Sequence, residues 1–131
     1  MESLISLFKA EPFKKEYDLN GVKVVLKMLS RKEYDDVMSR ANISSADIVS
    51  KEAILRRMVL GYSVVSINGV NIQDIKEVKE LVEKSNGLMP TNIAFERVLG
   101  DFDAFLVDSF YALYNQLVDD DEKNKEELKK D

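Results

Sequence analysis

Two Asn-Gly pairs, Asn20-Gly21 and Asn68-Gly69, constrain the fold of this chain more than any other feature of its sequence. Each pair lies between short runs in which apolar residues alternate with polar ones. This pattern is the strongest short-range signal of a β-hairpin, because both residues of a two-residue turn must adopt positive φ. We therefore predict two hairpins. Since two isolated strands are only marginally stable, each hairpin must pack on helices or further strands.

The two turns also predict which residues face each other across each hairpin. The first turn predicts three pairs: Leu19 with Val22, Asp18 with Lys23 and Tyr17 with Val24. The second predicts three more: Ile67 with Val70, Ser66 with Asn71 and Val65 with Ile72. In both cases the register gathers apolar side chains on one face of the hairpin, and in the first it places opposite charges across from each other on the other face.

The rest of the chain has the apolar spacing of helices, so we predict an α+β fold that is predominantly helical, with four to five helices. A short amphipathic lead-in, 1–12, precedes the first hairpin. The first predicted helix starts at the capping box Ser30–Glu33, and the second extends from near Ser44 or Ser45 to Leu60. The third is capped by Asp74 or Asn71 and ends at Asn86-Gly87. A last helical region, from Thr91 to Val118, is divided at Gly100-Asp101, where Asp101 is a second candidate cap. Gly61 is expected to end the second helix in the left-handed conformation.

Helical spacing also predicts which faces are buried. The helix after Ser30 is expected to bury four residues: Tyr34, Val37, Met38 and Ala41. Its opposite face is expected to be solvated and carries Asp35, Asp36, Ser39 and Arg40. On the second helix, Glu52 and Arg56 stand at the i, i+4 spacing of an ion pair.

The composition fits one compact domain. The chain has 131 residues, of which 45% are hydrophobic and 33% charged, and a chain of this length buries roughly two-thirds of the surface that its unfolded form exposes. We assign the domain to residues 1–118. Residues 119–131 have almost no apolar content, so we expect a charged, frayed or disordered tail.

Net charge and hydropathy limit the kinds of partner that we expect this chain to bind. The formal net charge is −5 and no basic patch is visible, so we expect no binding to nucleic acid, whose phosphates attract basic surfaces. No apolar stretch approaches the roughly 18 to 20 residues that span a bilayer, and the first residues lack the pattern of a signal peptide. We therefore expect a soluble protein with no membrane partner.

The sequence offers no constellation typical of an enzyme. It contains neither cysteine nor histidine, which excludes disulfides, thiol nucleophiles, imidazole bases and zinc sites of the usual kind. The neighbouring acids Asp35-Asp36 and the pair Asp101 and Asp103 are better explained as a solvated face and as helix caps, because no base, nucleophile or phosphate loop accompanies them. We predict no catalytic residues, no cofactor and no metal.

The last helical region is the strongest candidate for a contact surface, because it carries two apolar stripes where a helix packed on one surface needs one. The first stripe contains Phe102, Phe105, Leu106, Phe110, Leu113 and Leu117. The second contains Val107, Tyr111, Tyr114 and Val118. We predict six partner-binding residues: Phe102, Val107, Phe110, Tyr111, Tyr114 and Val118. The alternative is that this helix is simply the central, buried helix of a small bundle.

Two segments carry a family resemblance. Leu29 to Glu33 reads leucine, serine, basic, any residue, acidic at a helix start, and Val64 to Gly69 reads Val-Val-Ser-x-Asn-Gly at a turn. With the helix between them, these segments resemble the tail assembly chaperones of long-tailed bacteriophages. The resemblance extends over roughly Val24 to Ile72, and the later segments are similar only in their order.

The resemblance implies a non-enzymatic function in the host cell cytoplasm. Members of the family bind the long, apolar, helical tape measure protein, keep it soluble and help recruit tail tube subunits, then leave before the virion is complete. The family often produces a longer form by ribosomal frameshifting near the end of the short one. It has no catalytic residues to transfer. The sequence also leaves self-association open.

Two other classes of function remain open on the sequence. One is a permanent structural connector of a phage particle, or a small interaction adaptor. The other is a small enzyme, which would require a buried pocket with two or more convergent acids.

Overall fold

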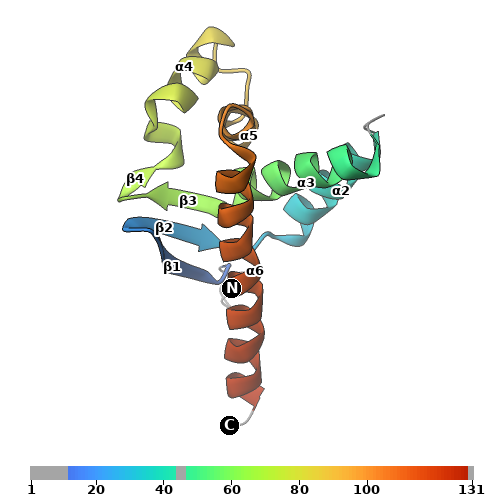
Figure 1. Cartoon of the computed structure of the whole chain (residues 1–131), viewed down its shortest axis with the longest axis vertical. Coiled ribbons are helices and arrows are strands. Elements are labelled where there is room, and N and C mark those ends of the chain that lie inside the picture. The colour runs from blue at the N-terminus through green and yellow to red at the C-terminus, as the bar shows by residue number, and fades with distance from the viewer. Residues whose placement is uncertain (1–11, 44–46, 130–131) are drawn as a thin grey trace, which may run out of the picture.

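The computed structural model describes residues 12–43 and 47–129, so the predicted lead-in helix falls almost entirely outside the described residues. The elements follow in this order: strands β1 (Lys14–Leu19) and β2 (Val22–Lys27), helices α2 (Arg31–Ile43) and α3 (Ile48–Ser63), strands β3 (Val64–Ile67) and β4 (Val70–Asn71), the 3₁₀ helix η1 (Ile72–Asp74), and helices α4 (Lys76–Lys84), α5 (Thr91–Gly100) and α6 (Ala104–Lys129). The predicted fold class, α+β and predominantly helical with two Asn-Gly hairpins, is confirmed (Figure 1).

Both Asn-Gly pairs form the predicted turns, with φ of 52° and 89° at Asn20 and Gly21, and 49° and 79° at Asn68 and Gly69. All three predicted pairs of the first hairpin are present, as are the pairs of Ile67 with Val70 and Ser66 with Asn71 in the second. The predicted pair of Val65 with Ile72 is wrong. Strand β4 ends at Asn71 because the buried Ile72 begins the 3₁₀ helix instead.

The two hairpins join into one antiparallel sheet in the order β1-β2-β3-β4. Val24 pairs with Ile67 across β2 and β3, and a β-bulge shifts the register farther along the strands. Two hydrogen bonds join the second turn to β2: Lys23 N donates to Asn68 Oδ1 at 2.8 Å, and Asn68 N donates to the Lys23 carbonyl at 2.7 Å. Each hairpin thus supplies the further strand that the other needs.

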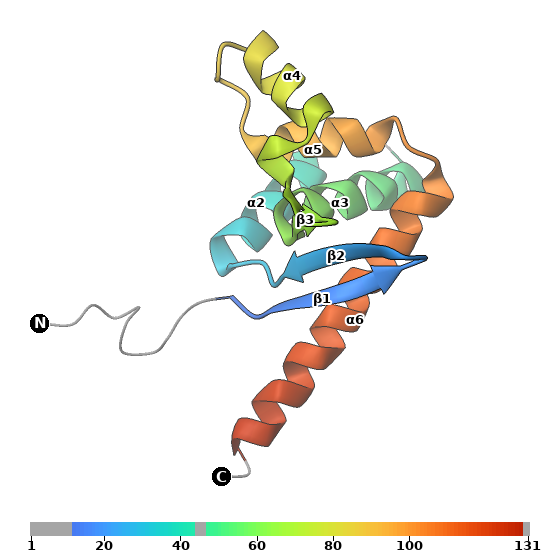
Figure 2. The same ribbon diagram turned by 90° about the vertical axis from the view of Figure 1, so that its left-hand side faces the viewer.

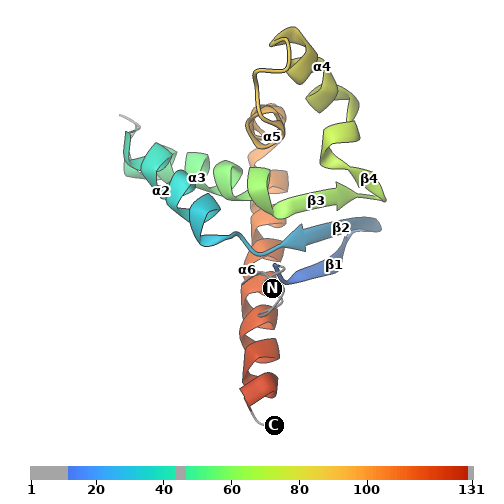
Figure 3. The same ribbon diagram turned by 180° about the vertical axis from the view of Figure 1, so that it is seen from behind.

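Helix α6 covers one face of this sheet, since it lies in front of the strands in Figure 1 and behind them in Figure 3. At the far edge of the sheet, α5 lies between α4 and α3 (Figure 2). One continuous core joins these layers. Its largest fully buried side chains are Phe95, Leu26, Leu60, Leu99 and Leu117.

Helix α2 begins at the predicted capping box, in which Glu33 N donates to Ser30 Oγ at 3.1 Å and Ser30 N donates to Glu33 Oε1 at 2.9 Å. Val37 and Ala41 are buried as predicted, but Tyr34 and Met38 are 46% and 37% exposed. That part of the prediction is wrong because α2 packs mainly against α3, and a single neighbour covers only a narrow stripe of a helix.

On the face of α2 predicted to be solvated, Asp35 and Ser39 are exposed, but Asp36 and Arg40 contact other elements. Arg40 donates to both carboxylate oxygens of Glu96, at 3.0 and 2.8 Å, and also contacts Asp36. Asp36 in turn accepts a hydrogen bond from Tyr62 at 2.6 Å. A bidentate arginine–carboxylate pair is among the stronger polar contacts in proteins, so this network links α2, α3 and α5.

Helix α3 differs from its prediction at both ends. It begins at Ile48, and the Asp47 side chain caps it by accepting a hydrogen bond from Ser50 N at 2.8 Å. The predicted start near Ser44 or Ser45 is therefore wrong. Both of those serines lie outside the described residues. The helix then continues to Ser63. Gly61 therefore lies inside it and does not end it. The predicted ion pair of Glu52 with Arg56 is replaced by one between Arg56 and Asp108 of α6, at 2.7 Å.

Gly61 is required by the close approach of two helices. A Cβ atom at this position would stand 2.7 Å from the Asn92 carbonyl oxygen and 2.9 Å from Glu96 Cγ, both on α5. Such a contact with backbone is prohibitive unless the helices move apart. The glycine at this position therefore sets how closely α5 packs against α3.

The later helix ends are partly as predicted. Asn86 and Gly87, with φ of 57° and 78°, follow α4, and the break at Gly100-Asp101 separates α5 from α6. The predicted cap of α4 by Asp74 or Asn71 is wrong, because Ile75 occupies the N-cap position and no side chain caps that end. At the start of α6 the cap is Asp103, which accepts from Phe105 N at 2.7 Å, and not Asp101.

Helix α6 runs for 26 residues, through most of the segment predicted to be frayed or disordered. That prediction is wrong as far as Lys129. Two kinds of contact favour the helix there: Lys125 pairs with Asp121 at 3.0 Å and i, i+4 spacing, and Asp120 is bound by β1. The assignment of residues 1–118 as a domain that folds without the tail stays a prediction.

The close contact at Gly61 predicts an unusual cost for a small substitution. We expect Gly61→Ala to lower the free energy of unfolding by about 2 kcal/mol, as overpacking does in other cores. Gly100→Ala is the matched control, because its Cβ would meet only the flexible Arg57 side chain, at 3.6 Å. Urea denaturation measures both. Equal unfolding midpoints for the two variants would contradict the assigned role of Gly61.

Candidate partner-binding surface

The apolar side chains of α6 divide according to what covers them. Val107, Phe110 and Leu117 are buried and join the main core. Val107 and Phe110 are two of the six residues predicted to bind a partner. The structure places both of them in the interior, where they stabilise the packing of α6 on the sheet and its neighbouring helices.

Tyr111 and Tyr114 lie between the two hydrophobic clusters of the protein and contact both. Their ring centroids are 5.9 Å apart, and the Arg56 guanidinium lies 5.5 Å from the centroid of the Tyr111 ring. Burial raises the pKa of the Tyr114 hydroxyl above its ordinary value. These tyrosines are half-buried, as is Val118, so this second stripe joins parts of the fold more than it faces solvent.

The remaining predicted residue, Phe102, lies at the bend between α5 and α6 and is 42% exposed. Two neighbours in the first turn of α6 are also exposed: Phe105 at 79% and Leu106 at 37%. We call Phe102, Phe105 and Leu106 the α5–α6 corner. Phe105 and Leu106 were placed on an apolar stripe but not among the binding residues. Their position directly after the Gly100-Asp101 break was the signal that could have identified them.

The α5–α6 corner is held in a fixed shape by polar contacts. Phe102 N donates to the Leu99 carbonyl at 3.1 Å, and the Asp103 side chain caps α6 through Phe105 N. One turn farther along, Arg56 of α3 donates to Asp108 at 2.7 Å. These contacts hold the backbone that carries the apolar side chains of the corner.

A hollow lies on each side of Phe102. The one toward α3 has a volume of about 220 Å³ and includes Ala53, Arg57 and Val107 in its lining. The one toward α4 has a volume of about 320 Å³ and includes Leu81 and Val98. Phe102 contributes to the walls of both. An incoming apolar side chain would find partly apolar walls in either of them.

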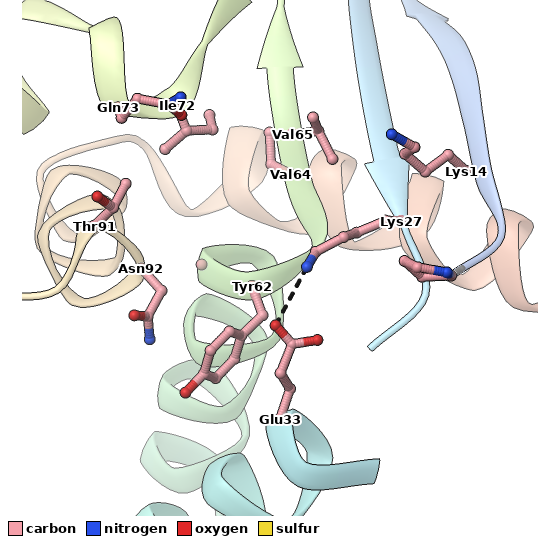
Figure 4. Close-up of a pocket in the computed structure, with 12 residues that line it drawn as sticks. Lys14, Lys27, Glu33, Tyr62, Val64, Val65, Ile72, Gln73, Thr91 and Asn92 are labelled. Atoms are coloured by element: carbon pink, nitrogen blue, oxygen red, sulfur yellow. Dashed lines mark hydrogen bonds and ion pairs between the residues drawn. The ribbon is translucent and has the colours of Figure 1, made fainter. Parts of the chain in front are cut away.

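A hollow of about 670 Å³ lies away from this corner, among β2, β3, the end of α3 and the start of α5 (Figure 4). Three polar side chains of its lining are engaged with the protein itself: Lys27 Nζ lies 3.3 Å from Glu33 Oε2, and Tyr62 donates to Asp36. Burial, together with that hydrogen bond, raises the pKa of Tyr62 to about 12. The wall is mixed in polarity, and we assign no reaction to it.

Residues 12–43 and 47–129 also bear on other kinds of site. No group of three or more acidic residues in that part of the chain is placed to hold a metal ion. No helix there combines the length and hydrophobicity needed to cross a membrane.

Comparisons of this chain with models of protein families, with curated proteins and with solved structures give no match. The resemblance to tail assembly chaperones therefore rests on the two sequence segments described above. The six predicted binding residues can be judged only by their surroundings in the fold, and those surroundings favour the α5–α6 corner.

The opposite part of α6 is fastened to the sheet by Asp120. Its Oδ2 atom accepts from the Tyr17 hydroxyl at 2.5 Å and lies 3.0 Å from Lys15 Nζ, while Gln116 donates to Oδ1 at 3.2 Å. The hydrogen bonds from Tyr17 and Lys15 lower the pKa of Asp120 to about 2. This clasp of Asp120 with β1 binds the second half of α6 to the edge of the sheet.

The Asp120 clasp predicts a pH-dependent contribution to stability. Because the folded pKa of about 2 lies below the unfolded value of about 3.9, the contribution is complete above about pH 5 and is lost as the pH falls toward 2. Asp120→Asn should therefore be less stable than the parent chain at neutral pH, and the difference should narrow between about pH 4 and pH 2. Urea denaturation across this range measures it. Asp119→Asn, an exposed neighbour, is the control, and a difference between Asp120→Asn and the parent that does not change with pH would contradict the clasp.

Proposed function

We propose that this protein is a tail assembly chaperone of a long-tailed bacteriophage. It acts in the host cell cytoplasm, binds the apolar tape measure protein, keeps it soluble and helps to recruit tail tube subunits. Two sequence segments, Leu29 to Glu33 and Val64 to Gly69, suggest the family. The function is binding and not catalysis.

The observation that carries the proposal is the exposure of Phe102, Phe105 and Leu106 together at the α5–α6 corner. Exposed apolar groups that lie side by side mark protein-binding surfaces more often than scattered ones do. Fully burying an exposed side chain of this size is worth about 1.5 to 3 kcal/mol, and Phe102 and Leu106, which are already partly covered, would contribute less than Phe105. Three such side chains on a rigid bend would supply a useful part of the affinity for an apolar client.

The geometry of the corner suits a helical client. Phe102 at the bend is bordered by a partly apolar hollow on each side, and Phe105 in the first turn of α6 is exposed to solvent. An amphipathic helix that binds in this way places apolar residues at i, i+3 or i+4 spacing against such a surface. Tape measure proteins are long, apolar and helical according to the family resemblance, so they offer many segments of this kind.

Charge supports the second half of the role, which is to keep the complex dispersed. The chain has a formal net charge of −5. The last turns of α6 extend beyond the sheet in Figure 2 and carry several exposed charged residues: Glu122, Lys123, Lys125, Glu126 and Glu127. A net charge away from zero opposes aggregation, so an apolar client bound at the corner would share this protection.

Co-expression with a tape measure fragment tests the proposal. We expect the parent chain to keep the fragment soluble, and the double variant Phe105→Asp with Leu106→Asp to lose most of this effect, because it places charges at the centre of the contact. Leu88→Asp is the matched control, since Leu88 is 85% exposed but lies in the loop between α4 and α5. Circular dichroism of each purified variant checks that the fold is retained.

Two outcomes of that experiment would contradict the proposal. One is a fragment that stays insoluble beside the parent chain. The other is a corner variant that solubilises the fragment as well as Leu88→Asp does. A structural connector or adaptor of the particle is the alternative, which the long projecting part of α6 would also suit. Finding the protein in purified virions at a fixed ratio to tail subunits would favour that alternative.

A further inference from the structure

The α5–α6 corner lies between two walls of opposite charge. Helix α5 is flanked by α4 on one side and α3 on the other (Figure 2). The hollow on the α4 side carries three acids, Glu77, Glu80 and Asp101, against one base, Lys84. We call these three acids the acidic wall. Phe102 forms part of the same hollow.

The wall on the α3 side is basic. Arg56 and Arg57 line the hollow there, with Asp108 and again Phe102. Arg56 is occupied by its ion pair with Asp108. Arg57 also lines the adjoining hollow of about 200 Å³ together with Arg97 and Glu96 of α5, and Glu96 is occupied by its ion pair with Arg40. We call Arg57 and Arg97 the basic wall.

The charges of both walls are without ion-pair partners among the described residues. Glu77, Glu80 and Asp101 make no salt bridge with any other residue in 12–43 and 47–129, and the same holds for Arg57 and Arg97 within those ranges. Phe102, which lines both hollows, lies between the two walls, and Phe105 and Leu106 follow it in the first turn of α6. The surface is thus apolar at its centre, acidic on one side and basic on the other.

We propose that two copies of this chain associate through their α5–α6 corners about a twofold axis. Such an axis brings the acidic wall of each copy against the basic wall of the other, while Phe102, Phe105 and Leu106 of both copies meet at the centre. A twofold interface uses the same patch on both copies, so it requires a patch that is complementary to itself. An apolar centre with a charged rim is the usual composition of a protein interface.

A second copy fits this surface better than an unrelated partner, because both signs of charge that the interface needs are already present on one chain. Each ion pair between the two copies, which we call a cross-pair, also occurs twice. Glu80 of the first copy faces Arg57 of the second, and Arg57 of the first copy faces Glu80 of the second. An acidic wall alone would attract a basic partner, and a basic wall alone would attract an acidic one. The two walls together on either side of exposed phenylalanines favour self-association.

This association goes beyond the proposed function and does not depend on it. If the protein is also a chaperone, a client and a second copy compete for the same corner. The dimer then covers the apolar side chains while no client is present. Client binding would shift the protein toward monomer, by the ordinary coupling of two equilibria that share one site.

The test is the association of the purified full-length chain, measured by sedimentation equilibrium over micromolar to millimolar concentrations. The parent chain should dimerise. Glu80→Arg and Arg57→Glu should each raise the dimer dissociation constant about tenfold or more, because each places like charges opposite each other twice. An equimolar mixture of these two variants should dimerise again, since every cross-pair in the mixed dimer joins opposite charges.

The controls make the same charge changes elsewhere. Glu126 and Lys123 are exposed residues on the last turns of α6. The variants Glu126→Arg and Lys123→Glu should each dimerise as the parent does. Phe105→Asp should also weaken dimerisation, because it places a charge at the apolar centre of the interface while it leaves both walls unchanged. The pair Glu77→Arg and Arg97→Glu repeats the charge exchange if either first variant fails to fold.

Three outcomes would overturn the inference: a parent chain that stays monomeric at millimolar concentration, corner variants that dimerise as the parent does, or a mixture that does not regain association. A monomeric parent that still solubilises a tape measure fragment would reject the dimer and keep the proposed function. A dimer that has no effect on the fragment would reject the proposed function and keep the dimer.

Discussion

The contact between Gly61 of α3 and the backbone of α5 determines how the rest of the structure is arranged. A Cβ at Gly61 would stand 2.7 Å from the Asn92 carbonyl oxygen, so only glycine allows the two helices to approach this closely. The same approach brings Glu96 within 2.8 Å of Arg40 on α2. It also sets the position of α5 relative to α3, and α5 leads into the bend at Phe102 and then into α6.

Helix α6 shows how one apolar segment can serve two purposes. The sheet and the neighbouring helices cover Phe110 and Leu117, and the Asp120 clasp fastens the helix to β1. The first turn lies at the bend with α5, where Phe105 is 79% exposed. The buried part gives the exposed part a fixed position. The proposed binding of a client and of a second copy both depend on that position.

The features that could be predicted from sequence are local ones. Asn20-Gly21 forms its turn, and Ser30 with Glu33 forms its capping box, because the interacting groups are within three residues of each other. The role of Gly61 could not be predicted, since it depends on α5, some thirty residues later. The two stripes of α6 were visible as a pattern, but periodicity does not show which turns lie over a sheet. For that reason the predicted site included the buried Val107 and Phe110 and omitted Phe105.

The central claim is that the α5–α6 corner is the surface that contacts a client, and site-specific photo-crosslinking tests it most directly. A photoreactive phenylalanine analogue is introduced at position 105, or at position 88 as the equally exposed control, and the protein is irradiated in cells that also express a tape measure fragment. Crosslinks to the fragment are expected from position 105 and not from position 88. Crosslinks to the fragment from position 88 alone would contradict the claim.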